Sequence, residues 1–339
     1  MTNLTVKRSS AFSNVGLVLL AFVVVGLLSA PLWAGRADMR LLSEIYLYLS
    51  LACLWNLMAG YAGLVSVGQQ AYVGFGGYLL FTLTMFFGLH PVPAIALAGV
   101  FAALLAIPIA TLIFRLNGAY FAIGTWVVAE VFRLVFAQIS ALGGGSGSSL
   151  PVSVVKSLAD SRSGRESLSY FLALGALIVI FVFIYSFLRS KRGLALTAIR
   201  DNDKAASGLG VSVWRAKLDV YVLTAGLTAV IGGLIFLQKL RISPDAAFSV
   251  NDWTAFVIFI VVIGGIGTLE GPIIGTLLFF LLRETLADYG TLYLVILGLV
   301  AILVMIKAPN GLWGWVSKKY GIEIFPMRYR VQFPDDKKG

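Results

Sequence analysis

The sequence predicts an all-α integral membrane protein, a polytopic bundle of about 8–10 membrane-spanning helices. Apolar residues make up 59% of the 339 residues, charged residues only 12%, and the mean hydropathy is +0.92. A soluble domain carries about 25% charged residues, so lipid must be the solvent for most of this chain. The 36 glycines and 10 prolines predict broken helices, which membranes tolerate where neighbouring groups satisfy the freed backbone. Residues 1–339 are predicted to form a single transmembrane domain.

Long apolar runs recur along the chain, and each span requires about 20 apolar residues. The run at residues 15–30 follows Lys7 and Arg8, and we interpret it as a retained first helix rather than a cleaved signal peptide. Residues 60–89 are too many for one helix and predict a broken segment followed by a full span. The spans are predicted at residues 15–33, 41–58, 60–89, 92–114, 119–139, 168–188, 218–237, 255–263, 273–282 and 292–306.

The basic residues predict the orientation of the chain in the membrane. Seven of them lie in residues 189–217 and seven in residues 307–339, whereas all loops on the opposite side together hold seven. Because cytoplasmic loops carry the excess of Lys and Arg, both termini are predicted to be cytoplasmic. Residues 189–217 then form a cytoplasmic loop, residues 308–339 a basic cytoplasmic tail and residues 141–168 an external loop. The net charge of +10 therefore indicates contact with anionic lipid headgroups and not with nucleic acid.

Two glycine-rich interruptions, residues 60–68 and 264–272, occur at corresponding places in two related halves of the chain. Unwound backbone at membrane depth persists only where it lines a cavity or is buried in protein, so paired interruptions predict a translocation pathway. The alternative interpretation is that these glycines only allow helices to pack closely. The residues predicted to line the pathway are Asn56, Gly63, Ser66, Gly68, Gln69, Gly264, Gly265, Gly267, Thr268, Glu270 and Gly271.

No motif for catalysis or for metal binding is visible in the sequence. It contains no Gly-x-x-x-x-Gly-Lys-Ser/Thr loop that could bind the phosphates of ATP. The Gly-Ser run at residues 143–148 follows no strand and is interpreted as a flexible connector. Cys53 and His90 are the only residues of their types, so neither a disulfide nor a metal site of cysteines and histidines can form, and no cofactor is expected. The chain is predicted not to be an enzyme, and any energy source lies on another protein.

A short amphipathic helix is predicted inside the loop at residues 189–217. Asp201, Asn202 and Asp203 can cap a helix that begins near Lys204. Glycines at positions 208 and 210 provide its end. A short helix held between two spans on the cytoplasmic face is what a membrane subunit presents to a motor subunit.

This loop resembles a known family. Residues 193–211 are similar to the cytoplasmic loop of LivM-type permeases, the branched-chain amino acid importers of the ABC superfamily. Ala205, Ala206 and Gly210 match the Ala-Ala-x-x-x-Gly core of the ABC-permease coupling loop, although Lys204 stands where the family usually has an acidic residue. Four further segments match family signatures in order: residues 56–63 with Ser66, Gly68 and Gly74, residues 116–123, residues 264–272 and residues 307–312. The chain departs from the family at Trp126 and at residues 143–149.

The resemblance implies one membrane subunit of an importer in the bacterial cytoplasmic membrane, with residues 141–168 in the periplasm. Its partners would be a second, LivH-type permease subunit, two cytoplasmic ATPases that bind ATP and Mg, and a periplasmic substrate-binding protein. The residues implied to couple to the ATPases are Asp203, Lys204, Ala205, Ala206, Gly208 and Gly210.

The sequence leaves alternatives open for the substrate and for the class of transport mechanism. Branched-chain amino acids are the family's usual cargo, and close relatives carry urea, amides or other carboxylates. A different class, an ion-coupled secondary carrier, needs ionisable residues in its spans. Few acidic residues lie in spans here, namely Glu44, Glu130 and Glu270, and Glu130 is expected to pair with Arg133 at i,i+3.

The predicted orientation can be tested by thiol labelling in a background that lacks Cys53. Because the basic residues place residues 142–167 outside, a cysteine at position 148 (Ser148→Cys) should react with an impermeant reagent added outside intact cells. The matched variant Ser207→Cys should react only after the cytoplasmic face is exposed. Labelling of position 148 from the cytoplasm would contradict the orientation.

Overall fold

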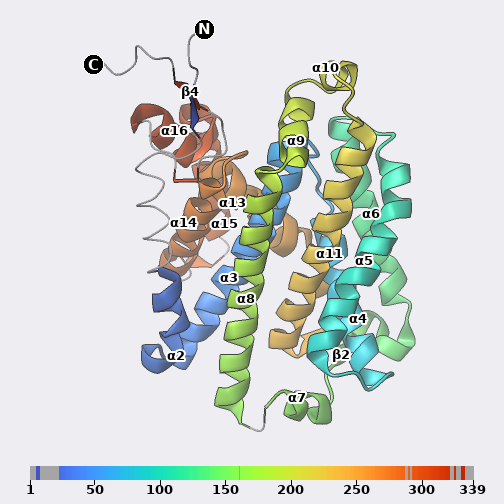
Figure 1. The fold of residues 1–339 in the computed structure, drawn as a ribbon. Coiled ribbons are helices and arrows are strands. Elements are labelled where there is room, and N and C mark those ends of the chain that lie inside the picture. The colour runs from blue at the N-terminus through green and yellow to red at the C-terminus, as the bar shows by residue number, and fades with distance from the viewer. Residues whose placement is uncertain are drawn as a thin grey trace.

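The computed structural model describes residues 5–7, 23–159, 161–286, 289–290, 292–320, 324–325 and 330–332. Most of this part of the chain is helical, and the long helices run side by side in one bundle (Figure 1). Residues 23–28 are helical and α2 (Ala30–Trp33) follows, but the rest of the predicted first span lies outside the described residues. The all-α polytopic fold that the sequence predicts is confirmed.

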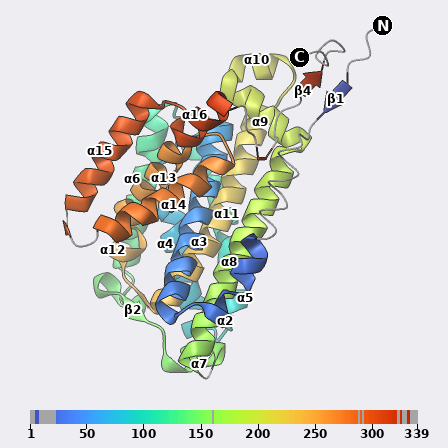
Figure 2. The same cartoon turned by 90° about the vertical axis from the view of Figure 1, so that its left-hand side faces the viewer.

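Helix α3 forms the centre of the bundle. It continues into a π-helical turn, η1, and it packs mainly against α8, α11, α13 and α14. Figure 2 shows α3 enclosed by these helices. Their bounds are α3 (Arg36–Asn56), η1 (Leu57–Tyr61), α8 (Arg162–Leu188), α11 (Val213–Lys239), α13 (Phe256–Gly264) and α14 (Glu270–Leu286).

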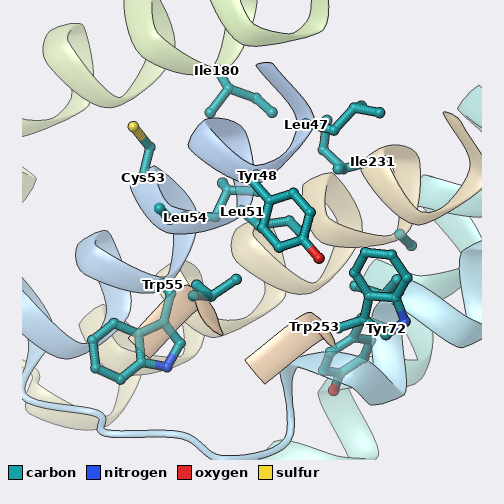
Figure 3. Packing of buried hydrophobic residues seen from close by; sticks show 14 of the residues in the cluster. Leu47, Tyr48, Leu51, Cys53, Leu54, Trp55, Tyr72, Ile180, Ile231 and Trp253 are labelled. Atoms are coloured by element: carbon teal, nitrogen blue, oxygen red, sulfur yellow. The ribbon is translucent and has the colours of Figure 1, made fainter. Parts of the chain in front are cut away.

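The middle of α3 is fully buried in apolar side chains. Leu51 and Leu54 have no exposed surface, and they pack with Ile180 of α8 and Ile231 of α11 (Figure 3). Cys53 is 2% exposed, as expected of a small apolar residue. This core separates the polar regions that lie at the two ends of α3.

One side of the bundle is formed by α4 (Gln69–Met85), α5 (Pro91–Ile113), α6 (Ala119–Ala137) and the central α11. The backbones of α4 and α11 touch at Gly232. A methyl group at this position would lie only 2.1 Å from the carbonyl oxygen of Val73. Small residues at such contacts hold membrane helices together through van der Waals packing.

The other side is formed by the C-terminal third of the chain. Here α12 (Pro244–Ala247) and the π-helical turn η4 (Asn251–Ala255) lead into α13, which packs against α14. Helices α15 (Leu292–Lys307) and α16 (Gly311–Tyr320) lie outside this pair, and α15 is largely exposed. The sequence predicts the α13–α14 pair correctly as two short helices on either side of a glycine-rich interruption.

The short elements gather at the two ends of the bundle. Figure 1 shows α9, α10 and α16 together at one end, called the α10 end below, and α7 and β2 at the other, the α7 end. At the α7 end β2 pairs antiparallel with β3. A second antiparallel pair joins β1 to β4 near the two termini. The bounds are α7 (Val152–Leu158), α9 (Lys191–Asp201), α10 (Asp203–Gly208), β1 (Thr5–Lys7), β2 (Ser148–Ser149), β3 (Arg241–Ile242) and β4 (Arg330–Gln332).

Seven helical segments in the described part of the chain are long and apolar enough to cross a membrane. Helices α4 and α14 have only 17 residues each, because each begins where an interruption in the chain ends. The protein is therefore a multi-pass membrane protein with two shortened helices inside the bundle.

Four segments differ from what the sequence predicts. Helix α8 begins at Arg162 rather than near residue 168, because Ser161 caps it and its first turn is charged, which hydropathy does not detect. Helices α7 and α9 were not predicted, since both are short and α9 is rich in polar residues. The Gly-Ser run, interpreted as a flexible connector, contains short regular elements: it follows the 3-10 turn η2 (Ser140–Leu142), includes the 3-10 turn η3 (Gly144–Ser146) and leads into β2.

Candidate translocation and coupling site

The two glycine-rich interruptions meet in space, although about two hundred residues separate them in sequence. The side-chain amide of Asn56 makes the connection: its Nδ2 donates to the carbonyl oxygen of Thr268 (2.7 Å), and its Oδ1 accepts from the backbone N–H of Gly267 (2.8 Å). Asn56 is 1% exposed. One buried amide thus satisfies a backbone donor and a backbone acceptor that the second interruption leaves free.

The first break, residues 57–68, consists of the π-helical turn η1 and a following non-helical segment that folds back along α3. Trp55 Nε1 donates to the carbonyl oxygen of Ser66 (2.8 Å), and Ser66 Oγ accepts from the backbone N–H of Gly68 (3.1 Å). Helix α4 then starts at Gln69, whose Nε2 donates to the carbonyl oxygen of Leu51 (3.1 Å). These polar groups therefore replace the hydrogen bonds that a continuous helix would have made.

The second break, residues 265–269, is a tight turn between α13 and α14. Gly265 and Gly267 both have positive φ angles, of 136° and 75°. Thr268 Oγ1 donates to the carbonyl oxygen of Gly265 (2.8 Å) and accepts from the backbone N–H of Gly271 (3.0 Å). The threonine hydroxyl thereby closes the turn and caps the start of α14.

The breaks approach each other so closely that only glycine fits at the contact. A methyl group at Gly60 would lie 2.6 Å from the backbone nitrogen of Gly267 and 2.5 Å from Oδ1 of Asn56. Gly264 has a similar restriction, because a methyl group there would lie 1.9 Å from the carbonyl oxygen of Gly271. The close-packing interpretation of these glycines therefore holds at this contact, and the segments that pack closely are interrupted backbone.

A side chain that the sequence did not single out also joins this contact. Nη1 of Arg200, in the last turn of α9, donates to the carbonyl oxygen of Gly60 (3.1 Å). The same guanidinium also contacts Asp201, which follows it in the chain. In the sequence Arg200 looked like one more basic residue of a cytoplasmic loop, and no local pattern indicated its long-range contact.

Helix α10 directly follows α9 and has the predicted cap. Asn202 Oδ1 accepts from the backbone N–H groups of Lys204 and Ala205, both at 3.0 Å. The helix begins at Asp203, and Gly210 lies beyond its end in a left-handed conformation with φ of 84°. The short capped helix expected near Lys204 is therefore present.

The surface of α10 differs in one respect from what its sequence indicates. Ala206 is 1% exposed, because it faces the rest of the chain, where α10 contacts α9 and α11. Leu209 is instead 82% exposed, and Lys204 and Ala205 are exposed as well. The exposed surface of α10 and of the residue after it therefore includes Lys204, Ala205 and Leu209, while Ala206 packs α10 against the rest of the chain.

Two open clefts at the α10 end lie on either side of Arg200. One, of about 790 Å³, runs between the first break and α10 and is lined by Gly63, Asn117 and Asp203 among others. The other, of about 960 Å³, runs between the second break and α8 and is lined by Tyr61, Gly267 and Glu270 among others. Of the eleven predicted pathway residues, Gly63 lines the first cleft, and Gly267, Thr268 and Glu270 line the second. Ser66 and Gln69 instead line a small separate cavity beside α3 and α11.

The carboxylate of Glu270, at the start of α14, is hydrogen-bonded to the C-terminal part of the chain. The carboxylate accepts from the backbone N–H groups of Ile324 (3.1 Å) and Phe325 (2.8 Å), and Glu270 is 6% exposed. The Phe325 ring packs against Phe181 of α8, with the centroids 5.1 Å apart. The segment after α16 is therefore attached to the edge of the second break.

A third cleft, of about 640 Å³, opens at the α7 end between α3, α8 and α11. Its charged side chains are mostly paired with one another: Glu166 with Arg40, and Glu44 with Arg283 at 2.7 Å. The ammonium group of Lys239 lies 4.6 Å from the centre of the Trp253 indole ring.

The expected ion pair between Glu130 and Arg133 also forms, with a distance of 2.6 Å between Oε1 and Nη2. In the described part of the chain, no group of His, Cys, Asp and Glu side chains could hold a metal ion.

Clefts at both ends, a packed middle and two broken segments that meet at one end define a multi-pass membrane protein built for transport. The comparisons with known proteins agree with this class. Residues 39–305 match the family described as branched-chain amino acid transport system permease components, and the chain belongs to this family.

Curated relatives from bacteria and archaea cover most of the chain. The high-affinity branched-chain amino acid transport system permease protein LivM of Escherichia coli is 29% identical over an alignment of 318 residues, and the match covers 86% of this chain and 74% of the relative. A probable LivM of Methanocaldococcus jannaschii is 21% identical, over 78% of this chain and 90% of the relative. A probable LivH of the same organism is 26% identical, over 74% of this chain and 83% of the relative.

The contact between the breaks predicts a strong effect of one methyl group. Gly60→Ala should lower the free energy of unfolding by about 1–3 kcal/mol, because overpacking forces backbone apart. Thermal denaturation of the detergent-solubilised protein measures this. The control is Gly175→Ala in α8, where an added methyl group meets nothing within 4 Å. Equal melting temperatures for the two variants would contradict the close approach.

Proposed function

We propose that this chain is one of two membrane-spanning permease subunits of an ABC importer in the bacterial cytoplasmic membrane. The observation that carries the proposal is a connection through α9: Arg200, just before the capped helix α10, bonds to Gly60 at the point where Asn56 joins the two breaks. Family membership and the names of the relatives support branched-chain amino acids as the substrate. Urea, amides and other carboxylates are the alternatives within the family.

The α10 end is proposed to face the cytoplasm, where two ATPase subunits bind ATP and Mg. They would dock on the exposed surface of α10 formed by Lys204, Ala205 and Leu209. A periplasmic substrate-binding protein would deliver the solute at the α7 end. The second permease subunit, of the LivH type, would complete the pathway.

An ion-coupled carrier is the competing class, and the contacts of the acidic side chains disfavour it. Such a carrier needs a carboxylate that can exchange an ion or a proton within the membrane. Glu44 and Glu130 each pair with an arginine, and Glu270 accepts two backbone N–H groups. Because these interactions already stabilise the three carboxylates, none of the three is suited to exchange an ion or a proton. Transport driven by ATP hydrolysis on a partner subunit therefore fits the site better than ion coupling.

Transport activity is the direct test of the proposed function. In proteoliposomes that contain this chain, its LivH-type partner and the two ATPases, the binding protein and ATP together should drive uptake of labelled leucine. The chain purified alone should hydrolyse no ATP, because its sequence has no phosphate-binding loop. Nucleotide turnover by the chain alone, or the absence of ATP-dependent uptake of any family substrate, would contradict the proposal.

The docking surface is tested by a charge at its most exposed apolar residue. Leu209→Glu should abolish co-purification with the ATPases, since a groove that receives leucine desolvates an added carboxylate. Val152→Glu is the matched control, because Val152 is 69% exposed but lies in α7 at the opposite end. Ala206→Glu should weaken docking indirectly by unseating α10. Unchanged co-purification of Leu209→Glu would show that the ATPases bind elsewhere.

A further inference from the structure

Arg200 connects three segments that the proposed mechanism must move together. Its Nη1 donates to the carbonyl oxygen of Gly60 in the first break (3.1 Å). The same nitrogen would lie 3.1 Å from a methyl group at Gly267, so the guanidinium also lies against the second break. Asn202, two residues further along the chain, caps α10. Arg200 therefore touches both breaks and is covalently close to the helix proposed to receive the ATPases.

The helix that carries Arg200 is anchored at its other end. At the corner between α8 and α9, a methyl group at Gly193 would lie 2.2 Å from the carbonyl oxygen of Leu188, so the two backbones touch there. From this corner α9 runs for 11 residues, about 16 Å at 1.5 Å per residue. A force applied to α10 acts at the far end of α9, where Arg200 is located.

The surroundings of Arg200 make its bond to Gly60 sensitive to such a movement. The side chain forms the wall between the clefts of about 790 and 960 Å³, which both include Arg200 in their linings. Its ion pair with Asp201 is solvent-exposed, with Asp201 73% exposed, and contributes little. The charge-assisted hydrogen bond to the Gly60 carbonyl is the interaction that fixes the guanidinium.

We propose that Arg200 is a positioning residue that transmits the displacement of α10 to the two breaks. When the ATPases move α10, α9 pivots about its corner with α8, and Arg200 pulls on the carbonyl of Gly60 and leaves Gly267. The contact between the breaks then opens at the wall between the two clefts. This inference rests on the proposed function of the chain as an ABC permease subunit.

The test compares ATP hydrolysis with solute uptake in the full reconstituted complex. Arg200→Gln removes the charge but keeps a hydrogen-bonding side chain, and Arg200→Lys keeps the charge but loses the planar guanidinium. The matched control is Arg192→Gln in the same helix, whose side chain is 72% exposed and whose carboxylate partner, Asp219, lies 3.7 Å away. Melting temperature and co-purification with the ATPases report whether each variant folds and assembles.

Arg200→Gln is expected to assemble and to hydrolyse ATP, while the amount of leucine imported per ATP falls by about ten-fold, which corresponds to the loss of one charge-assisted hydrogen bond. The amount of leucine imported per ATP by Arg200→Lys should lie between the amounts for Arg200→Gln and for the unsubstituted complex. Arg192→Gln should stay within about two-fold of the unsubstituted ratio, because exposed ion pairs contribute little.

Two outcomes would overturn the inference while leaving the proposed function intact. One is an unchanged import-to-ATP ratio in Arg200→Gln. The other is a parallel fall of hydrolysis, uptake and melting temperature, which would indicate a purely structural role for Arg200. Failure of the unsubstituted complex to import any substrate would instead overturn the proposed function, and this inference with it.

Discussion

The structure at the α10 end depends on one requirement, the satisfaction of interrupted backbone at membrane depth. A break in a membrane helix frees N–H and C=O groups that lipid cannot bind. Here the amide of Asn56 accepts from one backbone group of the second break and donates to another. The other polar contacts at the breaks, from Trp55, Ser66 and Thr268, serve the same need within each segment. Together with the close approach of Gly60 to Gly267, the Asn56 contact joins the two breaks in one junction.

This junction gives the two ends of the bundle different physical properties. At the α10 end, four segments distant in sequence meet through hydrogen bonds to backbone: α3, α9, the α13–α14 turn and the segment at Phe325. At the α7 end the charged side chains pair with one another, as Glu166 does with Arg40, and β2 pairs with β3. Backbone junctions without large side chains can rearrange with little change in packed volume. The movable part of the proposed mechanism is therefore at the α10 end, and the apolar core around Leu51 and Leu54 lies between the ends.

The segment after α16 adds a further link at this junction. Glu270 accepts two of its backbone N–H groups, and Phe325 fills space against α8. A carboxylate at the start of a helix is already favoured by the helix dipole. The same side chain therefore stabilises the beginning of α14 and fixes the C-terminal segment. The match to the family, residues 39–305, includes Glu270 and ends before α16 and Phe325.

The sequence by itself determined the all-α membrane fold, the two interruptions and the capped helix after Asn202, because these follow from hydropathy and from local backbone chemistry. Glycine runs identify broken helices, and an Asn before Lys204 and Ala205 is a local cap signal. Only the tertiary structure decided that the breaks touch, that Arg200 reaches Gly60, and that Ala206 is buried while Leu209 is exposed. Contacts between residues 140 or more positions apart leave no periodic pattern in one sequence. Which face of a six-residue helix is buried depends on the neighbouring helices α9 and α11, since so short a segment has too few apolar positions to define a face.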